Sequence, residues 1–250
     1  MARQTYAKYV ASWNIVFDTH EDPDNYHLKD EHSSPDFQPH LSIIPIDPRR
    51  YIRSGQDLAT THTLNINLNR AFDSALSYVH ADPTNPDIFF IIEDDDWYAP
   101  NYLETLCNLY LDNDMNFPLM GENPGPYYNV ARRRWRVFTN SAHAHLCATA
   151  VAYNQGLNLI TRSLDLRSHN PSIDLRLWRK YGRSWGKLTN NHDGPPLVVG
   201  IKGMPGRPGS TSGHKATVGY HDDPDLTQLI KWIGEEDAQS YCDYYRTPIS

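Results

Sequence analysis

Hydrophobic residues in the first half of the chain form short runs that are separated by a segment with helical spacing. Residues 10–17 and 41–46 are apolar runs with the length of β-strands. Between residues 57 and 80, apolar side chains recur every three or four positions, which predicts an amphipathic helix. Residues 88–92 are apolar at every position, a pattern typical of a strand buried on both faces.

The second half of the chain is less regular. Pro100 is well suited to the first position of another helix, because apolar residues follow it at helical spacing. Further elements are predicted as follows: a hairpin at 127–139, short helices at 157–167 and 172–181, a strand at 197–201 and an acidic helix at 224–240. The alternation of strands and helices predicts an α/β fold with a mixed, mainly parallel central sheet flanked by helices. No linker is evident, so we expect residues 1–250 to form a single domain.

Composition narrows the class of protein. The chain is 39% hydrophobic and 21% charged, which is typical of a globular protein, and no apolar run is long enough to cross a membrane. The N-terminal residues lack the continuous apolar core of a signal peptide. The three cysteines are far apart and form neither a disulfide framework nor a thiolate zinc motif. We therefore expect a cytoplasmic protein.

Charge is distributed unevenly along the chain. The overall net charge is −7, but residues 131–187 contain eleven arginines and lysines against two acids. That segment carries +9 and the rest carries −16. Such a division predicts a basic face for an anionic partner, although a solvated charged surface would give the same pattern.

Four consecutive acidic residues, Glu93 to Asp96, directly follow the apolar run 88–92. In open α/β sheets, ligands bind beyond the carboxyl ends of the strands, so these acids lie where a site is expected. If the backbone remains extended, Asp94 and Asp96 point to the same side and can hold Mg²⁺ or Mn²⁺. The alternative is that these acids only cap the following helix, which accounts for one or two of them.

Three segments resemble parts of the GT-A glycosyltransferases, especially those of the family 2 type. The sequence IFFIIEDDDWYAPNYLETL is similar to the DxD segment of that family. Residues 69–75 resemble its Asn-x-Gly-x-x-x-Ala helix, with Ala71 in place of the glycine. Residues 172–178 resemble the segment that supplies the catalytic carboxylate, here Asp174 alone. The resemblance implies a Rossmann-like GT-A fold over residues 40–215 or so.

The resemblance also implies roles for individual residues. The donor would be a nucleoside diphosphate sugar such as UDP-glucose, and the metal would be Mn²⁺ or Mg²⁺ held by Asp94, Asp96 and His214. Asp174 would be the base of an inverting hexosyl transfer, although a first-turn helix acid would look the same. The residues expected to contact the nucleotide are Asp94, Asp95, Asn69, Lys202 and Arg207. Residues 1–120 would form the nucleotide-sugar half, 121–215 the acceptor half and 216–250 a helical extension.

The basic segment interleaves cations with aromatic residues, a combination used to bind nucleic acids. The residues expected to contact the acceptor are Arg132, Arg133, Arg134, Arg136, Arg179, Lys180, Arg183, Trp178 and Trp185. The loop at 200–214 resembles that of small bacteriophage GT-A proteins, some of which glycosylate hydroxymethylated pyrimidines. The predicted acceptor is therefore 5-hydroxymethylcytosine in phage DNA, modified in the host cytoplasm.

The same sequence features are compatible with other functions. The chain could transfer sugar to a bacterial surface glycan, or bind DNA without catalysis. A two-metal nuclease is disfavoured because the sequence offers no second carboxylate group at a suitable spacing. His143 and His145 have a spacing that suits zinc on a strand, but no carboxylate or cysteine lies near them in sequence.

Overall fold

The structure is a computed structural model of the 250-residue chain. It describes residues 4–6, 9–10, 12–18, 40–46, 64–79, 87–138, 142–153, 155–164, 172–189, 194–205 and 212–246. The chain divides into two compact units that interleave in sequence. Unit 1 comprises residues 1–89 and 151–177, and unit 2 comprises residues 90–150 and 178–250. The single domain and the functional division at residues 120 and 215 stay predictions.

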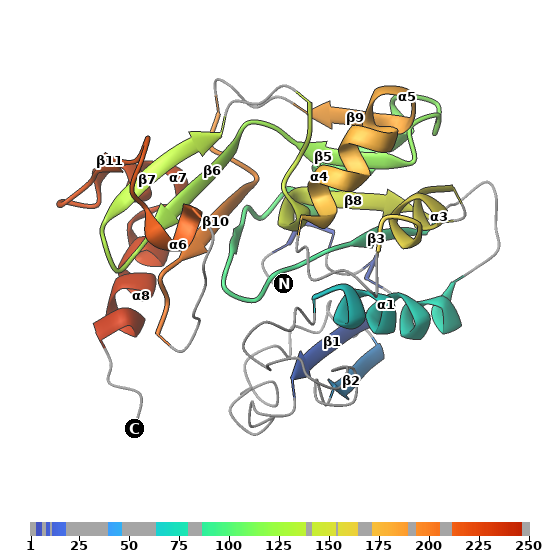
Figure 1. The fold of residues 1–250 in the computed structure, drawn as a ribbon, viewed down its shortest axis with the longest axis horizontal. Coiled ribbons are helices and arrows are strands. Elements are labelled where there is room, and N and C mark those ends of the chain that lie inside the picture. The colour runs from blue at the N-terminus through green and yellow to red at the C-terminus, as the bar shows by residue number, and fades with distance from the viewer. Residues whose placement is uncertain are drawn as a thin grey trace, which may run out of the picture. The chain divides into compact units, whose positions relative to one another are not determined.

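Unit 1 contains the two N-terminal strands and the first amphipathic helix. Strands β1 (Ser12–Asp18) and β2 (His40–Ile46) pair in parallel, and α1 (Leu64–Ala75) packs against both (Figure 1). Helix α1 continues into a 3₁₀ turn, η5 (Leu76–Tyr78). The helix buries Phe72 and Ala75, which belong to the predicted apolar face, and also Ile66, which does not; Leu76 of that face is 40% exposed. The Phe72 ring meets Phe89 edge-on, with 5.8 Å between ring centroids.

Two short helices complete unit 1, α3 (Gln155–Thr161) and α4 (Ile173–Leu177). The guanidinium of Arg176 connects them to α1. Its Nε donates to the Ser163 carbonyl at 3.2 Å, and its Nη2 donates to Oδ1 of Asn65 at 3.3 Å. One arginine of the basic segment is therefore used inside the fold.

A four-stranded sheet has the order β3-β8-β5-β9. Its strands are β3 (Ile88–Phe90), β5 (Leu119–Glu122), β8 (Thr149–Ala152) and β9 (Gly186–Thr189), and β5 and β9 are parallel. Helix α2 (Tyr102–Leu111) packs on β5 and β9. Its apolar side, which includes the buried Leu103 and Leu106, has the predicted spacing, but the helix begins two residues after Pro100.

Unit 2 contains a five-stranded sheet in the order β11-β7-β6-β10-β4 (Figure 1). Its strands are β4 (Trp97–Tyr98), β6 (Gly125–Asn129), β7 (Arg134–Phe138), β10 (Val198–Lys202) and β11 (His221–Asp222). Helices α7 (Thr227–Ile233) and α8 (Glu235–Arg246) pack on it, and Leu229 and Ile233 join Tyr128 and Ile201 in one buried cluster. Shorter elements are η6 (Leu146–Ala148), η7 (Trp178–Gly182), α5 (Arg183–Trp185) and α6 (Ser212–Lys215).

The predicted mixed α/β class is confirmed, but the sheets are not mainly parallel. In the five-stranded sheet only β10 and β6 pair in parallel, and β10–β4, β6–β7 and β7–β11 are antiparallel. The predicted hairpin at 127–139 is one cause, because a four-residue connection between β6 and β7 allows only antiparallel pairing. The predicted acidic helix at 224–240 is two helices, separated at Gly234 with φ of 86°.

No helix among the described residues is long and apolar enough to cross a membrane.

Glu122 links β5 to the start of β10 from inside the fold. It is 2% exposed, and its two carboxylate oxygens accept the backbone N–H groups of Leu197 at 2.7 Å and Val198 at 2.9 Å. Burial raises the pKa of Glu122 to about 7, although the two N–H groups favour the ionised form. The buried carboxylate of Glu122 is tolerated because it accepts hydrogen bonds from these two backbone N–H groups.

Replacing Glu122 with Gln is expected to destabilise the protein by about 1–3 kcal/mol at pH 8, where Glu122 is ionised. The glutamine amide can accept from only one of the two N–H groups, so the other loses its acceptor. Urea denaturation followed by circular dichroism measures the difference. The same change at the exposed Glu236 should alter the unfolding free energy by less than about 0.5 kcal/mol; equal losses would contradict the role of Glu122.

Candidate functional site

The four acids form a turn after β3, here called the acid turn (residues 93–96). The backbone N–H of Asp96 donates to the Glu93 carbonyl at 3.3 Å, so the chain is not extended through the acids. The extended backbone that would make Asp94 and Asp96 point to the same side is therefore not present. Asp94 is exposed, whereas Asp96 is only 6% exposed.

Asp96 anchors the acid turn to β10. Its Oδ1 accepts two hydrogen bonds, from the Ile201 backbone N–H at 2.8 Å and from Lys202 Nζ at 2.9 Å. Its Oδ2 is buried and has no hydrogen-bond partner among the described residues. Burial raises the pKa of Asp96 well above its ordinary value, although Lys202 acts in the opposite direction. Keeping Asp96 ionised is therefore costly, and a bound cation would offset that cost.

The ammonium of Lys202 lies among three of the four acids. Besides Asp96, Nζ lies 3.6 Å from Glu93 Oε2 and 3.6 Å from Asp95 Oδ2. Burial alone would lower the pKa of Lys202, but the three carboxylates raise it above its ordinary value, so the lysine stays charged. Three carboxylates therefore share one ammonium.

His214 lies within electrostatic reach of the same cluster. The Asn129 side-chain amide donates to the carbonyls of Gly213 and His214, both at 3.0 Å, and so fixes α6 beside β6. Burial and then Lys202 lower the pKa of His214, while Asp95 acts in the opposite direction. The imidazole is therefore neutral near pH 7 and able to act as a ligand.

Cys147 belongs to this cluster and was missed in the sequence. Its Sγ and carboxylate oxygens of Glu93 and Asp96 all lie within 4.8 Å of one another. Burial raises the pKa of the Cys147 thiol, and the two carboxylates raise it further, so it remains protonated. Nothing in the sequence could have indicated this, because Cys147 lies in an apolar run fifty residues after the acids.

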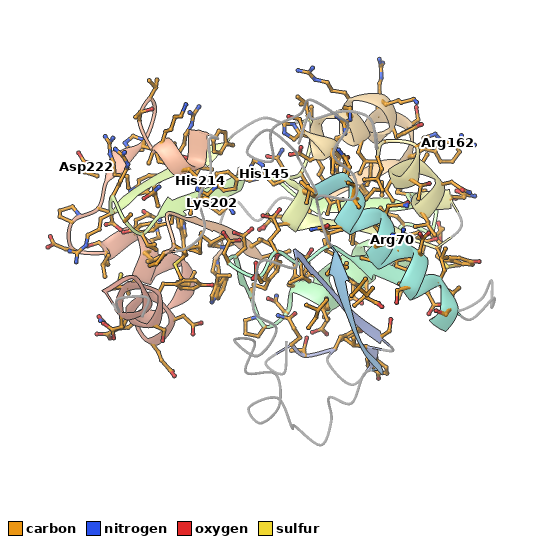
Figure 2. The ribbon with its side chains drawn as sticks, turned by 60° about the horizontal axis from the view of Figure 1, so that its bottom comes forward. Arg70, His145, Arg162, Lys202, His214 and Asp222 are labelled. Carbon is orange, nitrogen blue, oxygen red and sulfur yellow. The ribbon has the colours of Figure 1, made fainter. Side chains whose placement is uncertain are left out.

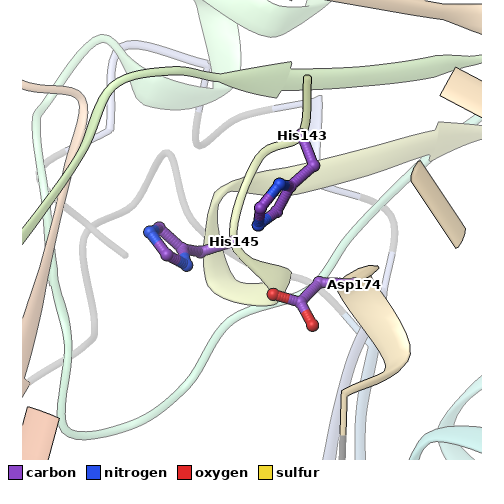
Figure 3. Close-up of side chains that lie close together, drawn as sticks. All are labelled: His143, His145 and Asp174. Atoms are coloured by element: carbon purple, nitrogen blue, oxygen red, sulfur yellow. The ribbon is translucent and has the colours of Figure 1, made fainter. Parts of the chain in front are cut away.

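His145 packs beside Lys202 in unit 2, next to an aromatic group. Its ring lies 4.6 Å from the ring of Tyr127, whose hydroxyl lies 3.3 Å from Nδ1. His143 is 5.9 Å away between ring centroids (Figure 3). Burial, with His143 and Lys202, lowers the pKa of His145 to about 4, so the ring is neutral at physiological pH. These contacts within unit 2 do not test whether His143 and His145 bind zinc.

The remaining predicted donor-site residues lie elsewhere. Asn69 is on α1 and Asp174 is in the first turn of α4, both in unit 1. Arg207 lies outside the described residues. The predicted roles of these three residues stay predictions.

The arginines around β7 hold the segment that leads to α7. Arg133 donates to the Pro224 carbonyl at 2.6 Å and Arg136 to the Val218 carbonyl at 3.0 Å. Arg134 donates to the Ala216 carbonyl at 2.7 Å and lies 2.8 Å from Asp222 (labelled in Figure 2). Arg132, by contrast, has an exposed side chain. These contacts give three of the four arginines a structural function.

Trp178 is a core residue, which contradicts the prediction that it contacts the acceptor. It is 2% exposed, and its Nε1 donates to Thr149 Oγ1 at 3.2 Å. Its ring fills the space beside three glycines, where an added Cβ would collide with it: Gly121, Gly182 and Gly186. The other predicted residues of this stretch are exposed, namely Arg179, Lys180, Arg183 and Trp185.

Comparison with known proteins found no matching family model and no matching curated protein. The function must therefore be inferred from the site itself. Its donors are carboxylate oxygens and one neutral imidazole, which suit Mn²⁺ or Mg²⁺. The excess of carboxylates over ammonium groups fits a divalent cation, as does Asp96 Oδ2, which has no hydrogen-bond partner among the described residues.

Trp178 and Trp185 provide a matched test of which tryptophan belongs to the core. Trp178→Ala should lower the unfolding free energy by about 3–5 kcal/mol, because it opens a cavity and removes the partner of Thr149. Trp185→Ala should cost about 1 kcal/mol or less, since Trp185 is 43% exposed. Urea denaturation followed by far-ultraviolet circular dichroism gives both values. Similar losses for the two variants would show that Trp178 is not the core residue described.

Proposed function

We propose that the chain is a metal-dependent glycosyltransferase of the GT-A type that takes sugar from a nucleoside diphosphate sugar such as UDP-glucose. One observation carries the proposal. Lys202 and His214 lie more than a hundred residues after the acid turn in sequence, yet Lys202 faces three of its carboxylates and His214 lies within electrostatic range of Lys202 and Asp95. Carboxylates, a cation and an imidazole together are suited to a metal and a diphosphate.

Each residue of the cluster has a distinct task in this proposal. The acids of the turn hold the cation together with His214; among them Asp94 is exposed, and Glu93 and Asp95 are partly exposed. When bound, the cation acts as a Lewis acid that neutralises charge on the leaving diphosphate. Asp96 keeps the turn on β10, and its Oδ2 has no hydrogen-bond partner among the described residues. Lys202 supplies a further positive charge for the diphosphate.

Two further roles are proposed for residues of unit 1. Asn69 would contact the nucleotide, and Asp174 would accept the proton of the attacking hydroxyl in an inverting transfer. Asp174 occupies the first turn of α4, where its carboxylate is partly exposed. Both roles come from the resemblance of these segments to the GT-A family.

The proposed acceptor is a hydroxymethylated pyrimidine, such as 5-hydroxymethylcytosine, in DNA. The exposed cations Arg179, Lys180 and Arg183 follow one another on η7 and α5, with the exposed Trp185 beside them. Cations at this spacing bind phosphates, and an exposed indole can stack on an unpaired base. The base hydroxyl must be reached in the major groove or by extruding the nucleotide.

Purified protein is expected to transfer or hydrolyse sugar from one of UDP-, GDP- or CMP-sugars when Mn²⁺ is present. Asp95→Asn should reduce kcat about 100-fold, because it weakens the charge that holds the cation. The exposed Asp225→Asn is the matched control and should keep normal turnover. The proposal fails if no sugar nucleotide is turned over and none binds in a metal-dependent way.

Replacing both Arg179 and Arg183 with alanine should weaken DNA binding and reduce its salt dependence. Each lost phosphate contact lowers the slope of log K against log salt by about 0.9 on duplex DNA. Arg162→Ala, an exposed arginine of unit 1 (Figure 2), is the control. Fluorescence anisotropy at several salt concentrations measures these slopes.

Two results would contradict DNA transfer and favour another function. Sugar turnover without DNA binding would favour a surface glycan, and DNA binding without turnover would favour a non-catalytic DNA-binding protein.

A further inference from the structure

The acid turn already holds a cation of its own, the ammonium of Lys202. Nζ is 2.9 Å from Asp96 and 3.6 Å from both Glu93 and Asp95. The lysine side chain is only 9% exposed, so solvent does little to screen these interactions. The same carboxylates are the ligands that a divalent metal would need.

Packing around its stem keeps Lys202 in this position. A Cβ added to Gly213 would lie 3.1 Å from Lys202 Cγ, so the α6 backbone covers the stem closely. Nζ also lies 5.7 Å from the centre of the Tyr127 ring, within range of a cation–π interaction. The ammonium is therefore held at the acids by its own surroundings.

The ammonium leaves part of the cluster unsatisfied. Asp96 Oδ1 is occupied by Lys202 and by the Ile201 N–H, but Oδ2 is buried without a hydrogen-bond partner among the described residues. That cluster holds carboxylate oxygens of Glu93 and Asp96 within 4.8 Å of each other. A metal ion with six coordination positions can join both, whereas Nζ has three protons and already faces three acids.

We propose that Lys202 is the resident counter-ion of the acid turn and competes with a divalent metal for the same carboxylates. Metal binding displaces Nζ from Asp96, because two cations cannot share one carboxylate cluster without strong repulsion. The displaced ammonium is then free to meet an anionic ligand such as a diphosphate. This inference rests on the proposed function only in taking the acid turn as the cation site.

The test measures Mn²⁺ binding to the full chain by electron paramagnetic resonance, with no nucleotide present. Lys202→Met should bind Mn²⁺ at least about tenfold more tightly than the wild type, because the competing charge is gone and Asp96 Oδ1 is released. Lys215→Met removes an exposed lysine of the adjacent α6 and should leave the affinity unchanged within about twofold.

The rise of Tm with Mn²⁺ provides a second readout, which the loss of a merely structural lysine would not change. Without metal, Lys202→Met should have a lower Tm than the wild type, because the buried Asp96 loses its ion-pair partner. Mn²⁺ should restore the Tm of this variant and raise it by more than it raises the wild-type Tm. If Lys202→Met does not fold without metal, refolding across a Mn²⁺ series should recover it, and no recovery would overturn the inference.

The outcomes separate this inference from the proposed function. If the wild type binds Mn²⁺ and Lys202→Met binds it no more tightly, only the competition is overturned. If neither protein binds Mn²⁺, the competition and the metal-dependent transfer both fail.

Discussion

The ion pair between the Asp96 carboxylate and the Lys202 ammonium is the interaction on which the candidate site depends. Both side chains are buried, and the same Asp96 oxygen accepts the Ile201 N–H, so the acid turn is held to β10 at two adjacent points. A buried charge is tolerated only with a partner, so each residue keeps the other in place. Glu93 and Asp95 are brought to Lys202 as a consequence, although neither contacts it as closely.

The positive charge of residues 131–187 serves two purposes. Arg133, Arg134 and Arg136 donate to carbonyls of the segment before α7 and so replace hydrogen bonds that regular structure would otherwise supply. The cations of η7 and α5 are exposed instead. The segment is therefore not one uniform basic face, because three of its arginines are engaged in hydrogen bonds to the backbone.

Local pattern was sufficient to predict most of the secondary structure. The runs at 10–17, 41–46 and 197–201 are strands, and the arginine-bearing hairpin at 127–139 is present, because side-chain periodicity records which faces are buried. Two expectations failed for reasons that are not local. The acids form a turn because Asp96 is drawn to β10, and Trp178 is buried because three glycines leave room for its ring.

The sequence by itself determined that four acids follow a buried strand, that the fold mixes helices and strands, and that basic residues gather in the second half. Tertiary structure alone decided which of the acids are buried and which residues they contact. It paired Asp96 with Lys202, placed Cys147 and His214 near them, and left Asp94 exposed. These contacts join residues fifty or more positions apart, and periodicity along the chain carries no information about such partners, because burial and charge pairing are settled only when the strands come together.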